Sequence, residues 1–149
     1  MTKFIVFIFA IFISIQANSS DLNEAILADN ESLALQLIAK TEDLNEQDKH
    51  GATAIYLASL RGQKELVEKL LSLGVDLNIL AKNGENALHA AADKEQVEIA
   101  KMLLEAGINH SLKNKYGDTP LDYYRNYPEH PMALLLAKYG ASTSKQHGI

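Results

Sequence analysis

The sequence repeats itself with a period of 33 residues. Two sets of glycines follow this interval, one opening and one closing each copy: Gly51, Gly84 and Gly117, then Gly74, Gly107 and Gly140. A fixed period of this length is typical of solenoids, in which each unit buries its apolar face against its neighbours. The period therefore predicts a stack of similar units rather than a single globular core.

Each full copy has the pattern of a tight turn followed by two helices, which makes the expected fold all-α. The opening glycine permits the positive φ of the turn. Thr53, Asn86 and Thr119 then stand where a side chain can cap the first helix, and Pro120 suits a first helical position. The second helix of each full copy ends in an apolar cluster: Leu66, Val67, Leu70, Leu71; Ile99, Ala100, Leu103, Leu104; and Ala133, Leu134, Leu136, Ala137.

Residues 20–44 form a degenerate copy without the glycines. Apolar spacing predicts helices over residues 21–28 and 31–40, the first capped by Ser20 or Asp21. Leu33, Leu37 and Ile38 are expected to face inward. The acidic outer face suits a terminal unit, because an open-ended stack needs a polar end to stay soluble.

These segments resemble ankyrin repeats. The resemblance rests on Thr119-Pro120-Leu121, on Asn86-Ala87-Leu88-His89-Ala90-Ala91 and on the recurring Leu-Leu-x-x-Gly. It implies an L-shaped solenoid with β-turn fingers and a concave surface that binds protein, and it implies no reaction. The expected units are a cap at 20–44 and repeats at 45–77, 78–110 and 111–142, followed by a flexible tail at 143–149.

The copies also depart from the pattern. Glu95 and Pro128 occupy the slot of Gly62, and proline cannot take positive φ, so the turn of the third repeat must differ. We expect residues 128–131 to rebuild it, with Pro131 opening the last helix. Tyr124 replaces the alanine of the earlier copies, which is tolerable where no repeat follows.

Residues 1–19 differ in composition from the rest of the chain. Lys3 is the only charge, residues 4–15 are apolar apart from Ser14, and the next five residues are small or polar. This order is typical of a secretory signal peptide. As a helix the apolar run would span about 18 Å, which is short of a hydrocarbon core of about 30 Å.

We therefore expect export with cleavage, and no stable membrane insertion afterwards. Cleavage after Ser19 gives a better small-x-small match than cleavage after Ala17. An uncleaved anchor lying at the membrane interface is the alternative. The bacterial periplasm is the expected location, with secretion as the alternative, since an oxidising compartment permits disulfides without requiring them.

Several kinds of chemistry have no signal in the sequence. The net charge of −5 gives the chain no electrostatic reason to bind nucleic acid, and the absence of cysteine excludes disulfides and thiol catalysis. The histidines form no zinc-binding pattern, so we expect neither metal nor cofactor and no enzymatic activity. His89 is expected to bond back to the cap residue Asn86, a structural role that the ankyrin resemblance implies.

A protein partner is expected on the concave face, at slots that recur from repeat to repeat. The partner-binding candidates are Lys49, Lys82, Lys115; His50, Asn83, Tyr116; Leu57, Tyr123; and Arg61, Lys94, Tyr127. Their positive charges suggest a partner with an acidic patch. The alternative for the first column is that lysine only keeps a turn tip soluble.

Tyr123 and Tyr127 carry most of this expectation. They are four residues apart on an expected helix and so share a face, and tyrosine is enriched among residues that dominate binding energy. Alternatively, the two rings shield the core of the last repeat.

The sequence therefore predicts an exported, non-catalytic protein-binding module that is a monomer when free. A periplasmic protective or toxin-neutralising factor is the leading use. A secreted factor that binds a host protein and a support protein for the envelope or for oxidative stress are the alternatives.

Overall fold

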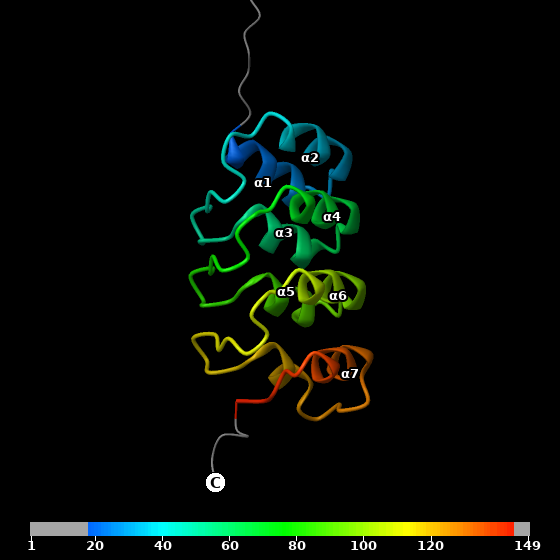
Figure 1. The fold of residues 1–149 in the computed structure, drawn as a ribbon. Coiled ribbons are helices and arrows are strands. Elements are labelled where there is room, and N and C mark those ends of the chain that lie inside the picture. The colour runs from blue at the N-terminus through cyan, green and yellow to red at the C-terminus, as the bar shows by residue number, and fades with distance from the viewer. Residues whose placement is uncertain (1–17, 145–149) are drawn as a thin grey trace, which may run out of the picture.

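The computed structural model describes residues 18–144, which form a single stack of helical pairs (Figure 1). The prediction of an all-helical solenoid is confirmed, since no strand occurs in this part of the chain. In chain order the elements are α1 (Ser19–Leu27), α2 (Glu31–Ile38), α3 (Ala54–Arg61), α4 (Lys64–Ser72), α5 (Ala87–Asp93), α6 (Val97–Glu105), the 3₁₀ helix η1 (Pro120–Tyr124) and α7 (Pro131–Lys138). The first 17 and last five residues of the predicted signal and tail lie outside the described range.

The loops between successive pairs project to one side of the stack as fingers (Figure 1). Neighbouring fingers are joined through their backbones, because the N–H of Lys82 donates to the carbonyl of His50 at 2.9 Å. The N–H of Lys115 donates to the carbonyl of Asn83 at the same distance. These bonds fix the spacing of the finger tips, so equivalent side chains in successive repeats form columns.

The predicted helix caps are present in the full repeats. The side chain of Thr53 accepts from the N–H of Tyr56, and that of Asn86 accepts from the second and third residues of α5. At the last repeat Asp122 accepts from the N–H of Thr119 at 2.8 Å, which closes the expected capping box. Each bond satisfies a donor that the helix leaves free.

The expected cap of the first helix was wrong. The helix α1 begins at Ser19 and its N-cap is Asn18, two residues before the first of the expected candidates. Asp21 contributes from inside the helix by accepting from the N–H of Asn18 at 3.2 Å. The helix begins earlier than expected because Ser19 is buried in the fold. It is 8% exposed, and its hydroxyl donates a hydrogen bond to the carboxylate of Glu46.

The inward faces of the two terminal second helices also differ from expectation. Leu33 of α2 is 42% exposed, whereas Leu66, in the same slot one period later, is fully buried. The reason is that, within residues 18–144, no further helical pair covers this side of α2. In α7 the buried residues are Met132, Ala133 and Leu136. Leu134, from the expected apolar cluster, is 53% exposed, and its slot is occupied by the exposed residues Glu68 and Lys101 in the earlier repeats.

Three of the four inter-helix turns share one conformation. Asp29 and Glu95 adopt positive φ, at 55° and 56°, in the slot where Gly62 has 73°. The fourth turn differs as predicted, because its slot holds Pro128. In this repeat the first helix is the short 3₁₀ helix η1. Pro131 is the first residue of α7, and the side chain of the N-cap residue His130 accepts a hydrogen bond from the N–H of Met132.

Candidate protein-binding surface

The predicted lysine column lies at the finger tips. Lys49, Lys82 and Lys115 are all exposed, and none of them forms a salt bridge within residues 18–144. Their charges are therefore available to a partner. Tyr116, at the outermost position of the last finger, is 81% exposed.

The second column is less uniform than the sequence predicts. His50 is exposed, but Asn83 is half-buried and its side-chain oxygen accepts from the N–H of Glu85 at 3.2 Å. Asn83 therefore shapes its own turn, and the column offers His50 and Tyr116 to solvent.

The third column was wrong at Leu57. This residue is 4% exposed and Ala90, one period later, is 1% exposed, so a partner cannot reach either of them. Their side of the first helices is packed between neighbouring units, where α3 lies against α1 on one side and α5 on the other. The half-exposed position is one residue earlier, at Tyr56.

Tyr123 is held within the protein. Its hydroxyl donates to one oxygen of Glu85 at 2.9 Å, and the hydroxyl of Tyr56 donates to the other at 2.9 Å. Asn114 adds a bond to the Tyr123 hydroxyl at 3.1 Å. One carboxylate thus joins side chains from three successive repeats, an arrangement that we call the Glu85 clasp (Glu85, Tyr56, Tyr123 and Asn114).

The clasp raises the pKa of both tyrosines. Burial is the larger cause for each, followed by the carboxylate of Glu85, and the pKa of Tyr56 rises to about 12. A tyrosine hydroxyl is protonated at neutral pH at its ordinary pKa of about 10, and the raised pKa values extend this protonation to more alkaline pH. Sequence columns missed the clasp because Tyr56 and Tyr123 are two periods plus one residue apart, so they never share a slot.

The residues of the fourth column lie in different settings, and the expected helix face shared by Tyr123 and Tyr127 is not formed. Tyr127 is 67% exposed, but it lies beyond η1 in the loop before α7, so it does not share a helix face with Tyr123. Arg61 is engaged with Asp29 at 3.6 Å and Lys94 with Asp93 at 2.9 Å. A partner would have to compete for these two cations.

His89 has the structural role expected of it. Its ring is fully buried, with Nδ1 2.8 Å from the side-chain oxygen of Asn86 and Nε2 3.2 Å from the carbonyl oxygen of Asp118. Burial lowers the pKa of His89, although the backbone bond to Asp118 opposes that shift. The histidine ties the helix start to the next finger.

The exposed candidates on this surface are charged and aromatic side chains that suit protein binding. No cluster of three potential metal ligands occurs in the described part of the chain. None of the helices between residues 18 and 144 is both long and apolar enough to cross a membrane. The exposed groups that remain from the prediction are Lys49, His50, Lys82, Lys115, Tyr116 and Tyr127.

Comparison with known proteins agrees with this architecture. A family model described as ankyrin repeats, in three copies, matches residues 22–114, which is more than half of the chain. The matched region includes the degenerate first unit. No curated protein shows a match. The chain therefore belongs to the ankyrin-repeat family, whose repeats form protein–protein interaction modules.

Proposed function

We propose that the protein is an exported, non-catalytic binding module that captures an acidic patch of another protein with its finger tips. The observation that carries this proposal is the pair Lys82 and Lys115. Both are exposed, form no salt bridge within residues 18–144, and are fixed on adjacent hydrogen-bonded fingers beside Tyr116. Lysines steer an acidic partner into encounter, and an exposed tyrosine supplies contact energy.

Export is supported by the order of Lys3, the apolar run and the small residues that follow it. The fold bears on the position of cleavage. Cleavage after Ala17 would leave Asn18 to cap α1, whereas cleavage after Ser19 would remove both the cap and the buried Ser19. We therefore favour cleavage after Ala17, although the small-x-small pattern favours the later site.

A protective role in the periplasm suits such a module. Capture alone can neutralise a toxic exported enzyme, because covering its surface requires no chemistry from the binding protein. Steered association would also make capture fast at low concentration. The same property would serve a partner that the cell must hold in place.

The test is capture from the envelope and periplasmic fractions of the producing cell. We expect the tagged protein to recover a partner, and a Lys82→Glu/Lys115→Glu variant to lose it. The matched control is Lys69→Glu/Lys138→Glu, which makes the same charge change at exposed positions on α4 and α7. Equal recovery by the two variants would contradict the role of the finger tips.

The tyrosines provide a second measurement on the captured partner. Tyr116→Ala should weaken binding by about 2 kcal/mol, the scale of a dominant interface residue, without changing the melting temperature. N-terminal sequencing of the recovered protein checks export, and a retained Met1 would contradict cleavage.

A further inference from the structure

A groove of about 470 Å³ lies on the outer side of the first helical pair, at the end of the stack that α1 and α2 form (Figure 1). Asp21, Glu24 and Ala25 line it from α1, and Leu33 and Leu37 line it from α2. We call it the end groove. It lies away from the finger tips, because none of the residues 18–144 that line it belongs to a finger.

The apolar slots of the end groove are those that the later units bury. Leu66 and Leu70, one period after Leu33 and Leu37, are both fully buried. They are covered because α3 and α4 pack against α1 and α2, and the N–H of Leu66 donates to Glu31 of α2 at 3.2 Å. The end groove is therefore the surface with which a unit of this stack docks onto another helical pair.

Two slots of the groove depart from that pattern in charge. Asp21 and Glu24 are exposed, whereas Ala54 and Leu57, one period later, are 2% and 4% exposed. Neither carboxylate forms a salt bridge with a residue between 18 and 144, and Lys40 lines the groove only beyond the end of α2. An apolar occupant would leave both carboxylates buried and unpaired, which is costly, so an occupant with positive charge on the α1 side is favoured.

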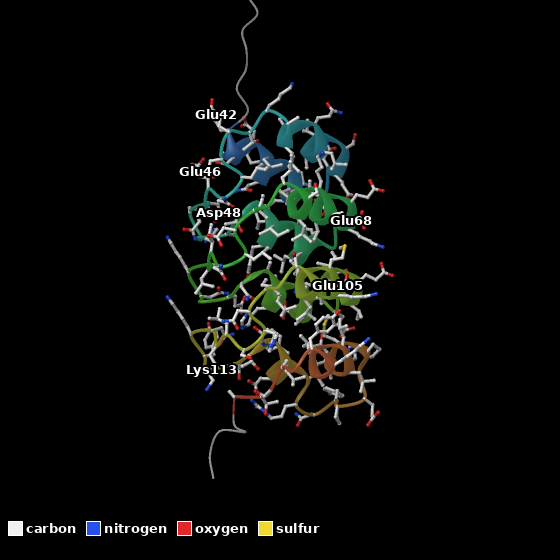
Figure 2. All side chains as sticks on the ribbon, in the orientation of Figure 1. Glu42, Glu46, Asp48, Glu68, Glu105 and Lys113 are labelled. Carbon is white, nitrogen blue, oxygen red and sulfur yellow. The ribbon has the colours of Figure 1, made fainter. Side chains whose placement is uncertain are left out.

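The shape and charge of the first unit define the occupant further. Helices cover the equivalent slots within the stack, and an amphipathic helix is the element that lays an apolar stripe into such a groove. Residues 18–48 have eight acidic side chains and one basic one, and Glu42, Glu46 and Asp48 gather on the finger side of this unit (Figure 2). Their field attracts a basic helix, whose lysine or arginine stems can also cover apolar surface.

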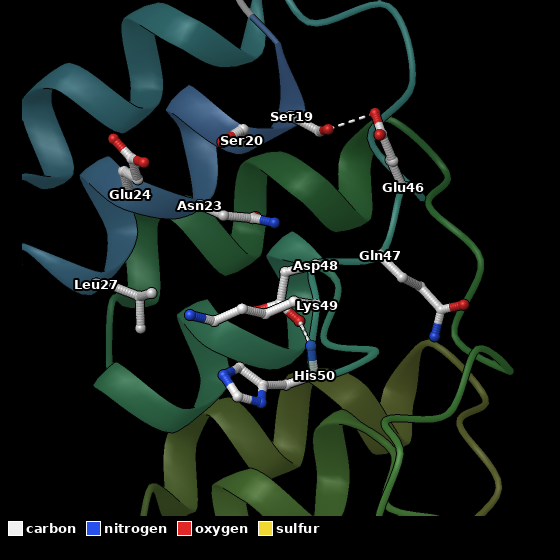
Figure 3. A pocket seen from close by; sticks show the side chains of 10 residues that line it. All are labelled: Ser19, Ser20, Asn23, Glu24, Leu27, Glu46, Gln47, Asp48, Lys49 and His50. Carbon is white, nitrogen blue, oxygen red and sulfur yellow. Dashed lines mark hydrogen bonds between the residues drawn. The ribbon is translucent and has the colours of Figure 1, made fainter.

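A second hollow lies on the finger side of α1, between this helix and the first finger (Figure 3). There the hydroxyl of Ser19 donates to Glu46, so the finger is already bonded to that side of the helix. Lys49 and His50 also line this hollow, so the chain places basic groups of its own beside the acids. The end groove is the surface of the first unit that is left for a partner.

A second copy of the chain does not suit the end groove. At the other end of the stack, the Thr119 hydroxyl donates to the carbonyl of Ser142 at 3.1 Å, and the N–H of Ser144 donates to Asp122 at 2.9 Å. A copy that docked head to tail would have to displace these residues. Two first units facing each other would bring their carboxylates together, which is unfavourable. A different protein is therefore the expected occupant.

We propose that the end groove receives an α-helix of a partner protein, whose apolar stripe lies against Leu33 and Leu37 and whose lysine or arginine side chains lie beside Asp21 and Glu24. This contact is separate from the one at the finger tips and has the opposite charge preference. It rests on the proposed function in one respect, because signal cleavage removes the apolar run at residues 4–15, which would otherwise compete for the groove.

The direct test is a titration of the purified protein, with the N-terminus that the cell leaves on it, against a fluorescent synthetic helix of leucine and lysine. Its leucines recur at helical spacing and form one stripe. We expect a saturable rise in fluorescence anisotropy. One control peptide has the same composition without the stripe, and the other has glutamate in place of lysine. Neither should bind, and equal binding by either control would overturn the proposal.

Matched substitutions assign the binding to the groove. Leu33→Gln should weaken binding of the leucine–lysine helix about tenfold or more, because apolar contact is lost. Leu134→Gln, which removes an exposed leucine of α7, is the control. Glu24→Gln should weaken binding by a smaller factor, and Glu68→Gln on the exposed face of α4 should not. Equal affinity in Leu33→Gln and Leu134→Gln would overturn the proposal.

The competing occupants have measurements of their own. Self-association in sedimentation that Leu33→Gln abolishes would make a second copy the occupant. Peptide binding that appears only after removal of residues 1–17 would make the chain's own apolar run the occupant. Either result would overturn the proposal. The Lys82→Glu/Lys115→Glu variant should bind the peptide at least as tightly as the wild type, so a failure of partner capture at the finger tips contradicts the proposed function alone.

Discussion

At the scale of single residues, Gly51 and Gly117 occupy the same slot in different surroundings. Their φ angles are 76° and 83°. A Cβ at Gly51 would lie 2.9 Å from the backbone nitrogen of Lys82, whereas a Cβ at Gly117 would meet nothing within 4 Å. The first glycine is needed for conformation and for close approach, and the second for conformation alone.

We predict that Gly51→Ala destabilises the protein more than Gly117→Ala. In both variants the free energy of unfolding should fall by about 1 kcal/mol, because alanine is strained at positive φ. Only the first should lose a further 1 to 3 kcal/mol, because the extra methyl overpacks the contact between fingers. Urea unfolding of the two variants measures the difference, and equal losses would show that the fingers separate without cost.

Asp122 should make the stability of the fold depend on pH in the acidic range. Burial alone would raise the pKa of its carboxyl, but bonds from the Thr119 N–H, Arg125 and the Ser144 N–H outweigh this and hold the pKa well below its usual range. A depressed pKa contributes stability that is present above the unfolded value, about 3.9, and is lost as the pH falls below it.

We predict that Asp122→Asn is about 2 kcal/mol less stable at neutral pH, because charged hydrogen bonds are lost. Its unfolding free energy should also fall less steeply than that of the wild type between about pH 4 and pH 2. The control is Asp118→Asn, which changes the more exposed partner of the same Arg125. Parallel acid profiles for Asp122→Asn and the wild type would contradict this role.

At the scale of elements, the Glu85 clasp should limit stability in alkali. The folded pKa of Tyr56 is raised to about 12, chiefly by burial and then by Glu85. A raised pKa contributes stability that is fully present below the unfolded value, about 10, and is lost as the pH rises through the folded value. The stack should therefore weaken between these two values.

We predict that Tyr56→Phe flattens this alkaline decline, because the substituted ring has no proton to lose. The decline is measured as the difference between the free energies of urea unfolding at a pH just below 10 and at a pH near 12. Tyr127→Phe, which alters a ring that is 67% exposed, is the control. An identical decline in Tyr56→Phe and the wild type would exclude Tyr56 as its source.

The sequence predicted those elements whose causes are local. Glycine slots, caps and the turn altered by Pro128 follow from φ preferences and hydrogen bonds within a few residues. The missed features depend on neighbours distant in sequence. Leu57 is buried by packing between adjacent units, and Glu85 joins tyrosines from the repeats on either side. Neither cause can be read from one copy.

At the scale of the whole molecule, the charge is distributed unevenly along the stack. Residues 18–48 carry eight acidic side chains and one basic one, whereas residues 49–149 carry 11 acidic and 12 basic ones. The first unit is also open on its outer side, where Leu33 is 42% exposed. In a solenoid each unit depends on its neighbours, so this terminal unit combines repulsion with the loss of one neighbour.

We predict that α2 opens before α4 in native-state hydrogen exchange. At low ionic strength amides of α2 should exchange faster than their equivalents one period later in α4. Adding salt should reduce the gap, because the screening length falls from about 30 Å at 0.01 M to about 8 Å at 0.15 M. Amides of α6 serve as the internal reference, because its acids Glu98 and Glu105 are paired with Lys64 and Lys101.

The response to salt separates two causes of this early opening. Repulsion among the acids is screened by salt, but the missing neighbour beside Leu33 is not. A gap that closes with salt would assign the weakness to charge. A gap that does not respond would contradict the prediction and leave the exposed face of α2 as the cause.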